Sequence, residues 1–136
     1  MHVRVLTPEE EVLQTSAITV TLITELGAIQ IFPGHASLHG VIELSPLRIE
    51  VDQHTALDFV VRKGFVFIDQ EADEITIQVY ACQKKDELTH VTLKEYLELL
   101  LRHLKNHEQL GAYHLRYLEE EQKTVQKQYD LLEEKK

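Results

Sequence analysis

Cysteine, tryptophan and proline are scarce in this sequence of 136 residues, which contains one cysteine, no tryptophan and three prolines. The single cysteine, Cys82, cannot form an intrachain disulfide, so nothing in the chain requires an oxidising compartment. No apolar run approaches the roughly 18 residues of a membrane-spanning helix. Residues 1–10 show neither the apolar core of a signal peptide nor an Arg-rich transit pattern. We therefore expect a mature chain that begins near Met1 and stays in a reducing cytoplasm.

Basic side chains are also few, and the formal net charge is −9. Binding to nucleic acid requires clustered Lys and Arg, so this charge argues against a nucleic-acid partner. Residues 1–87 contain six basic and fourteen acidic side chains, whereas residues 88–136 contain eight basic and nine acidic ones. The contrast indicates two structural units with different partners, although an uneven charge is more often a feature of solubility.

Residues 1–87 carry the period-two pattern of β-strands, with apolar and often β-branched side chains at alternate positions. These positions are Val3 and Val5; Ile18, Val20 and Leu22; Ile29 and Ile31; Leu47, Ile49 and Val51; Leu57, Phe59 and Val61; Phe65 and Phe67; Ile75, Ile77 and Val79. Turn residues separate the runs at Thr7-Pro8-Glu9, at Gly27, at Pro33-Gly34 and over residues 69–73. Seven to ten short strands without an intervening helix predict an all-β, antiparallel sandwich or flattened barrel.

From residue 88 the apolar period changes to steps of three and four, which is typical of a helix. The first helical stripe consists of Leu93, Tyr96, Leu97, Leu100, Leu101 and Leu104. Thr92 and Glu95 have the spacing of a capping box, and Val91 and Tyr96 have that of a hydrophobic staple. We therefore expect a helix that begins near Leu93, with Thr92 as its N-cap.

A second stripe with the same steps predicts another helix. It consists of Leu115, Leu118, Gln122, Val125, Tyr129 and Leu132. Residues 106–111 contain the only glycine after Gly64, so we place a turn there and expect an antiparallel hairpin over residues 88–136. A single unbroken helix from Thr92 to about Glu133 is the competing interpretation. Both stripes are narrow, so the hairpin should be marginal alone, and two possible docking surfaces would make it a natural switch.

No group of side chains in the sequence has the pattern of a catalytic site, and we expect neither a cofactor nor a metal. The five glycines are isolated, which excludes a phosphate-binding glycine loop. His103, His107 and His114 could lie near one helix face and bind zinc, but ordinary surface histidines are the favoured interpretation. The acidic run Glu119–Glu121 is interpreted as a solvated helix face, and Cys82 as a small apolar residue of the fold.

One stretch resembles a known family. Residues 32–38, Phe-Pro-Gly-His-Ala-Ser-Leu, are followed by Pro-Leu-Arg-Ile at residues 46–49. This order is similar to the hallmark of the epsilon subunit of bacterial F-type ATP synthases, in which a strand rich in Gly, Phe and Ile leads into a Pro-Gly-His-Ala-Pro-Leu turn and then an Arg-Ile strand. The resemblance covers roughly residues 1–83, and the helical tail matches in kind and length only.

The sequence departs from the family pattern at several positions. The acidic residue that often faces the membrane ring is missing, because the family's Gly-Glu-Phe-Gly or Gly-Glu-Leu-Gly corresponds to Gly-Ala-Ile-Gln at residues 27–30. The family's Gly-Gly pair corresponds to Lys63-Gly64, and Ser37 replaces the proline before Leu38. The first helix lacks the Asp and Arg-Ala pattern with which some members bind ATP, so ATP binding is not carried over. These differences indicate a divergent branch.

The resemblance implies a ten-stranded sandwich over residues 1–87 and a two-helix hairpin over residues 88–136. It implies a non-catalytic rotor subunit of the central stalk, which couples ion flow through the membrane ring to ATP synthesis. The implied partners are the gamma subunit, the ring of c subunits and, through the helices, the alpha and beta subunits. Such a protein lies peripherally at the cytoplasmic face of the bacterial inner membrane, with its helices able to inhibit ATP hydrolysis.

Two sets of residues follow from the resemblance as candidate interfaces. Contact with gamma or the c-ring is expected at Phe32, Pro33, Gly34, His35 and Leu38. Contact of the regulatory helix is expected at Arg116, Lys123 and Lys127. For the histidine of the first set, a purely structural role in the turn is an equally good interpretation.

Two other classes of function remain open at this point. A stand-alone adaptor could present the helical hairpin to a different assembly, and the apolar stripe of the second helix supports it equally well. A small binding enzyme with a pocket inside the sandwich is the weakest alternative, because the inward positions are Val, Ile, Leu and Phe without converging polar groups.

Overall fold

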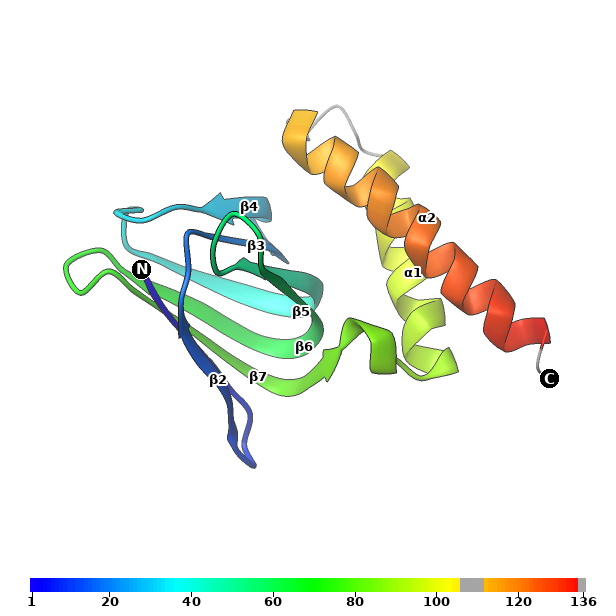
Figure 1. The fold of residues 1–136 in the computed structure, drawn as a ribbon, viewed down its shortest axis with the longest axis horizontal. Coiled ribbons are helices and arrows are strands. Elements are labelled where there is room, and N and C mark those ends of the chain that lie inside the picture. Colours follow the sequence, from blue (N-terminus) through cyan, green and yellow to red (C-terminus); the bar gives the residue numbers. More distant parts are fainter. Residues whose placement is uncertain (106–111, 135–136) are drawn as a thin grey trace. The chain divides into compact units, whose positions relative to one another are not determined.

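The computed structural model describes residues 1–105 and 112–134. The chain forms two compact units, Met1–Asp86 and Glu87–Lys136, which we describe one at a time (Figure 1). The first unit contains the strands, a short 3-10 helix, η1 (Lys85–Glu87), lies at the junction, and the second unit contains two α-helices.

Seven strands form a single sheet in the first unit. They are β1 (His2–Leu6), β2 (Glu11–Ser16), β3 (Thr19–Thr24), β4 (Gly27–Ile31), β5 (Leu38–Glu50), β6 (Ala56–Asp69) and β7 (Glu74–Lys84). Their order in the sheet is β2-β1-β7-β6-β5-β3-β4. The prediction of a wholly antiparallel sheet is wrong at one pairing, because β1 runs parallel to β7. Five other strands separate this pair along the chain, which is ample length for the crossover that a parallel pair needs.

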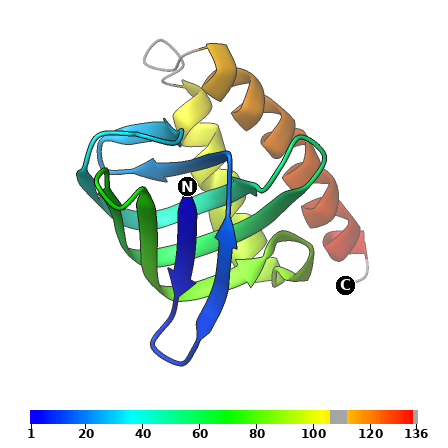
Figure 2. The same ribbon diagram turned by 60° about the vertical axis from the view of Figure 1, so that its left-hand side comes forward.

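The sheet wraps around one apolar core, and Figure 2 shows the curvature of its long strands. Strands from both ends of the sheet contribute to this core. Its buried members include Val3, Val5, Val20, Leu22, Ile31, Ile42, Leu47, Ile49, Phe59, Val61, Val66, Ile68, Ile75, Ile77 and Val79. The alternating apolar residues of the sequence are thus the inward-facing residues of a β-sandwich, as predicted.

The three long strands change their inward face at a shared position, which allows the sheet to fold over itself. In β6, Phe59 and Val61 point to the core before the change, and Val66 and Ile68 point to it afterwards. Side chains on one face of a strand are separated by an odd number of residues, but four residues separate Val61 from Val66. The alternation therefore shifts by one position between them. Lys63 lies at the change and has a left-handed backbone with φ of 53°.

The neighbouring strands bend at the positions that face Lys63. The pairing of β5 with β6 and of β6 with β7 keeps the same register on both sides of this row, which places Glu43 and Tyr80 beside Lys63. The inward face shifts in β5 between Ile42 and Leu47 as well. In β7 the inward face also shifts across this row, because Val79 before it and Cys82 after it both pack on the core. The row Glu43–Lys63–Tyr80 is called the bend row below.

The bend row explains why we find seven strands and not the ten expected from the resemblance. Strands β5, β6 and β7 have 13, 14 and 11 residues, well above the usual length of about five or six. On one side of the bend row they continue into β1 and β2, and on the other side into β3 and β4. Each long strand therefore serves both layers of the sandwich, where ten shorter strands would each serve one.

Two neighbouring residues make the bend possible. Gly64 follows the left-handed Lys63, and a Cβ atom at this glycine would lie 2.0 Å from the carbonyl oxygen of Gln78 and 2.6 Å from the Cα of Val79. These are backbone atoms of β7, which cannot move aside as a flexible side chain could. A glycine is therefore required here for the close approach of the two backbones.

A proline close to the bend leaves a gap in the hydrogen-bond ladder, and a serine fills it. The pairing of β3 with β5 ends at Thr21 and Arg48, and Pro46 has no N–H with which to continue it. The hydroxyl of the buried Ser45 accepts the N–H of Ile23 at 2.7 Å and donates to the carbonyl of Pro46 at 2.6 Å. Buried backbone groups are thus satisfied where the strands diverge.

The second unit is built from α1 (His90–Lys105) and α2 (Ala112–Glu134). Helix α1 begins earlier than predicted, because Thr89 and not Thr92 is its cap. The hydroxyl of Thr89 accepts the N–H of Thr92 at 3.2 Å, as an N-cap residue does. The expected hydrophobic staple is absent, since Val91 is 64% exposed. None of the helices among the described residues is long and apolar enough to cross a membrane.

The two helices form an antiparallel pair, and the competing single helix is wrong. The hydroxyl of Tyr96 on α1 donates to the carboxylate of Glu121 on α2. Residues separated by 25 positions would lie about 37 Å apart along one helix. Near the start of α1, His90 contacts Glu133 near the end of α2. The predicted turn over residues 106–111 lies outside the described residues.

The bend row gives a first prediction, on stability. The substitution Gly64→Ala forces a Cβ atom against the backbone of β7 and should lower the free energy of unfolding by at least about 2 kcal/mol. Lys63→Gly removes the strain of a left-handed lysine and should change that free energy by less than about 1 kcal/mol, in either direction. Urea unfolding of the full chain measures both. Equal losses for the two variants would contradict the role of Gly64.

Candidate interface surfaces

The segment that carries the family resemblance forms a tight turn between β4 and β5. The carbonyl of Phe32 accepts the N–H of His35 at 3.1 Å, which closes the turn. Pro33 and Gly34 occupy its two central positions, and Gly34 has φ of 82°. Proline followed by a left-handed glycine is the sequence of a type II turn.

The turn is tied to the connection between β6 and β7, far from it in the sequence. The N–H of Gly34 donates to the carboxylate of Asp73 at 3.2 Å, and the side-chain amide of Gln70 donates to the carbonyl of Gly34 at 3.2 Å. The N–H of Gln70 also donates to the hydroxyl of Ser37 at 3.0 Å. These bonds fix the loop without using its apolar side chains.

Asp73 is a residue of this loop contact that the sequence did not reveal. The N–H of Gly34 lowers the pKa of its carboxyl, and the amino group of Met1, 3.4 Å from the carboxylate, adds to this effect. Asp73 has φ of 52°, a conformation that Asp and Asn tolerate better than most residues. An aspartate at the end of a hairpin connection is too common a pattern to indicate such a role.

The five residues expected at the gamma or c-ring contact differ in what they offer a partner. Phe32 is 52% exposed and presents an apolar ring to solvent. Pro33 and Gly34 are exposed as well. The ring nitrogen Nδ1 of His35 lies 2.7 Å from the carbonyl of Ala36, so this side chain interacts with the backbone of its own turn. Leu38 packs against the core, and a change there would affect the fold.

A larger apolar surface lies on the outer face of β5 and β6. Val41 is paired with Phe65, and His39 is paired with Phe67. Val41 and Phe65 are 40% and 50% exposed. The rings of His39 and Phe67 meet edge to face with centroids 4.9 Å apart, and those of Phe65 and Phe67 are 6.0 Å apart. We call these four residues the outer apolar face.

The sequence contained a signal for this surface. In Phe65-Val66-Phe67 three apolar residues are consecutive, and only Val66 is fully buried. Because side chains alternate between the two faces of a sheet, such a run must expose part of its apolar surface unless both faces are covered. Exposed apolar clusters of this kind mark sites of interaction with other proteins.

The second unit carries the predicted basic residues on one exposed helix face. Arg116, Lys123 and Lys127 are all exposed on α2. Their spacings of seven and four residues place them within about 40° of one another around the helix. Glu120 lies near the same face, so the surface is basic but not uniformly so.

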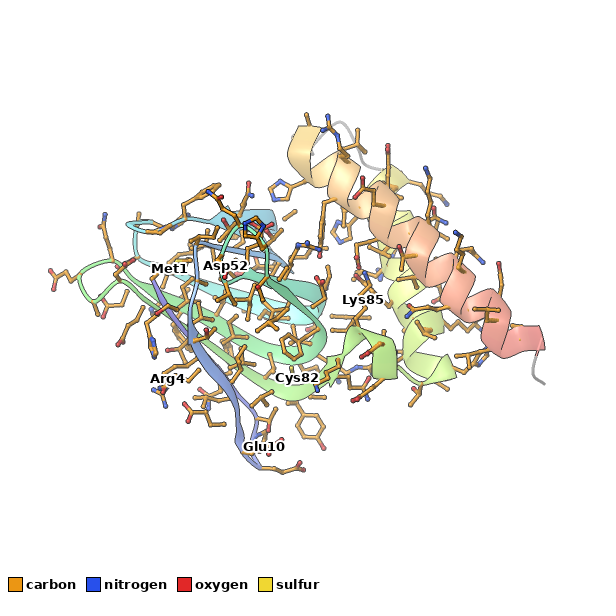
Figure 3. All side chains as sticks on the ribbon, in the orientation of Figure 1. Met1, Arg4, Glu10, Asp52, Cys82 and Lys85 are labelled. Carbon is orange, nitrogen blue, oxygen red and sulfur yellow. The ribbon has the colours of Figure 1, made fainter. Side chains whose placement is uncertain are left out.

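The remaining chemical hypotheses receive little support from the geometry. Among residues 1–105 and 112–134, no three side chains of the metal-ligating types form a group. His107 lies outside the described part of the chain, and burial followed by the charge of Arg102 lowers the pKa of His103. Burial raises the pKa of the Cys82 thiol to about 11, and this residue packs beside the core on β7 (Figure 3).

The interpretation of Glu119–Glu121 as a solvated face is wrong for its last member. Glu121 is only 5% exposed, and its carboxylate accepts the hydroxyl of Tyr96 at 2.5 Å. Glu119 and Glu120 are exposed, as expected. The sequence could not distinguish the three, because a partner for a buried carboxylate comes from the other helix.

Comparison with known proteins places this chain in a family. Residues 1–84 match the model of the ATP synthase delta/epsilon chain, β-sandwich domain. The chain is 30% identical over 98 residues to an ATP synthase epsilon chain of Prochlorococcus marinus, covering 72% of this chain and 71% of the relative. It is 33% identical over 88 residues to that of Synechococcus elongatus, covering 65% and 62%.

Solved structures show the same fold. A chain of the central stalk and c-ring structure of the mitochondrial ATP synthase of Tetrahymena thermophila has a TM-score of 0.56 at 22% identity, covering 64% of this chain and 68% of that one. A chain of the mitochondrial ATP synthase of Euglena gracilis has a TM-score of 0.55 at 16% identity, covering 86% and 71%.

The chain therefore belongs to the ATP synthase delta/epsilon family, and the assignment to the epsilon subunit of an F-type ATP synthase is confirmed. Epsilon chains are non-catalytic subunits of that complex, so the prediction that this protein is not an enzyme is confirmed by its family.

The contact of Gly34 with Asp73 gives a second prediction, on pH dependence. A lowered pKa stabilises the fold above the ordinary aspartate pKa of about 3.9, and this contribution is lost as the pH falls through the lower folded value. Asp73→Asn should therefore lower the melting temperature at pH 7 and flatten its decline between about pH 5 and about pH 2. Glu71→Gln, in the same turn, is the matched control and should keep the slope. An unchanged slope in Asp73→Asn would show that the carboxylate contributes nothing.

Proposed function

We propose that this protein is a rotor subunit in the central stalk of a rotary F-type ATP synthase, where it helps to couple ion flow through the membrane ring to ATP synthesis. The match of the sandwich unit to the delta/epsilon family carries this proposal. The likeness to a chain from a central stalk and c-ring structure supports it at the level of the fold. The protein then lies peripherally at the cytoplasmic face of a bacterial inner membrane, held there by the complex.

In this proposal the sandwich unit binds gamma and lies next to the c-ring. Phe32 and the outer apolar face are exposed apolar surfaces that can supply binding energy. Aromatic side chains dominate the energy of many interfaces because each buries a large area with few rotatable bonds. Ala28 stands where the family has an acidic residue, so a contact with the ring here would not depend on a carboxylate at that position.

A third prediction tests the contact with gamma. Phe32→Ala and Phe65→Ala should each raise the dissociation constant for purified gamma at least about tenfold, because each removes an exposed ring that would be buried in the complex. The double change Phe32→Ala with Leu38→Ala should weaken binding further, but it also removes a side chain that packs on the core. Titration calorimetry or a sedimentation assay measures the binding.

Ile18→Ala is the matched control, because Ile18 is 42% exposed but its N–H bonds to Glu50, at the opposite end of β5 from Val41. Its dissociation constant should equal that of the unchanged protein. Tight binding by both phenylalanine variants would place the gamma interface elsewhere. No binding by the unchanged protein would favour the stand-alone adaptor.

The helical unit is proposed to regulate hydrolysis by contact with the alpha and beta subunits. Arg116, Lys123 and Lys127 present three positive charges on one exposed face of α2, which suits an acidic partner surface. Exposed charge pairs are screened by salt, so the regulation should weaken as the ionic strength rises.

A fourth prediction tests this regulation in the reconstituted complex. Changing Arg116, Lys123 and Lys127 together to Ala should raise the rate of ATP hydrolysis several-fold and leave assembly intact, and the difference should shrink at high salt. Lys94→Ala removes an exposed charge from α1 and should have no effect. If deletion of all residues after Glu87 leaves hydrolysis unchanged, the helices do not inhibit.

A further inference from the structure

Polar contacts join α1 to α2 at Tyr96–Glu121 and at His90–Glu133, and the proposed function makes use of neither. The first is the bond between Tyr96 and Glu121. The tyrosine is fully buried, the glutamate is 5% exposed, and the hydroxyl lies 2.5 Å from the carboxylate oxygen. A hydroxyl that donates to a carboxylate forms one of the stronger hydrogen bonds in proteins, and burial from water strengthens it.

The second contact lies near the start of α1 and the end of α2. The ring of His90 stacks on that of Tyr129, with centroids 4.9 Å apart and an angle of 20°. The Nε2 of His90 also lies 2.5 Å from a carboxylate oxygen of Glu133. Tyr129 itself bonds to Glu133, and this bond raises the pKa of the tyrosine hydroxyl. Three side chains from two helices therefore meet at one point.

These contacts differ from the apolar stripes in one respect that matters for opening. Leu118 and Val125 could pack on the apolar surface of α1 or on that of another helix with similar energy, because apolar contact has no direction. A hydrogen bond requires a specific partner at a specific distance. When α1 and α2 separate, the apolar side chains can find new surfaces, but both polar contacts are lost.

We propose that Tyr96–Glu121 and His90–Tyr129–Glu133 form a two-point polar latch that holds α2 on α1 and sets how readily the hairpin opens. Its relevance to inhibition rests on the proposed function, since only an opening hairpin could reach other subunits. The existence of the latch does not depend on that function, because its contacts lie within this chain.

Hydrogen exchange of the full chain, followed by mass spectrometry, tests the latch. Tyr96→Phe should speed the exchange of the slow amides in both helices about tenfold, which corresponds to about 1.4 kcal/mol. Glu121→Gln replaces the charged acceptor by a neutral amide oxygen and should speed the same exchange by a smaller factor, at least about threefold. The double variant should exchange no faster than the faster single one, because Tyr96→Phe already removes the shared bond that Glu121→Gln only weakens. Glu133→Gln keeps the stacked rings of His90 and Tyr129 but removes the carboxylate that His90 contacts across the hairpin, and it should speed exchange near the ends where these residues lie.

Glu120→Gln is the matched control, because it removes the same charge from the neighbouring, exposed position of α2. Its exchange should equal that of the unchanged protein. The latch is refuted if Tyr96→Phe and Glu121→Gln leave exchange within twofold of the control, or if their effects simply add.

The reconstituted complex separates the latch from the proposed regulation. If both are right, Tyr96→Phe should speed helix exchange and also deepen the inhibition of ATP hydrolysis, because a loosened hairpin opens more often. Faster exchange with unchanged hydrolysis would support the latch and contradict the regulatory role of the helices. Unchanged exchange would overturn the latch whatever the rate of hydrolysis.

Discussion

The close approach of β6 and β7 at Gly64 is the contact on which the sandwich depends. Only where these backbones can nearly touch can the long strands turn sharply and reverse their inward side. The reversal brings the apolar residues of both layers to one interior, and it leaves Val41 and Phe65 on the outside. The core and the candidate docking surface are thus two results of the same bend.

Sequence pattern predicted the strands well, because burial on one face imposes alternation on residues such as Val3, Val5, Ile75 and Ile77. It could not show that the alternation changes phase within a strand, since a phase change looks like the end of one strand and the start of another. For this reason the structure has seven strands where the resemblance implied ten. The parallel pairing of β1 with β7 was also hidden, because partners distant in the chain leave no local trace.

The helical unit shows a similar limit. The steps of three and four predicted two helices, and the one-turn error at the start of α1 arose because Thr89 and Thr92 are both good caps. The sequence did not show which charged residue of α2 is buried, since Glu119, Glu120 and Glu121 are chemically identical and only Glu121 faces a hydroxyl on α1. The common exposed face of Arg116, Lys123 and Lys127 was easier to predict from the sequence, because helical spacing alone places these residues together.

The bend row also limits how the length of this chain can change. Each long strand has one extra residue there, which shifts its alternation by one position, and the strands stay paired because the extra residues lie in the same row. Loss of that residue from β6 alone would turn half of the strand inside out. Loss from all three strands together would restore a single alternation from end to end, and the two halves of each long strand would no longer turn their apolar residues toward one shared core.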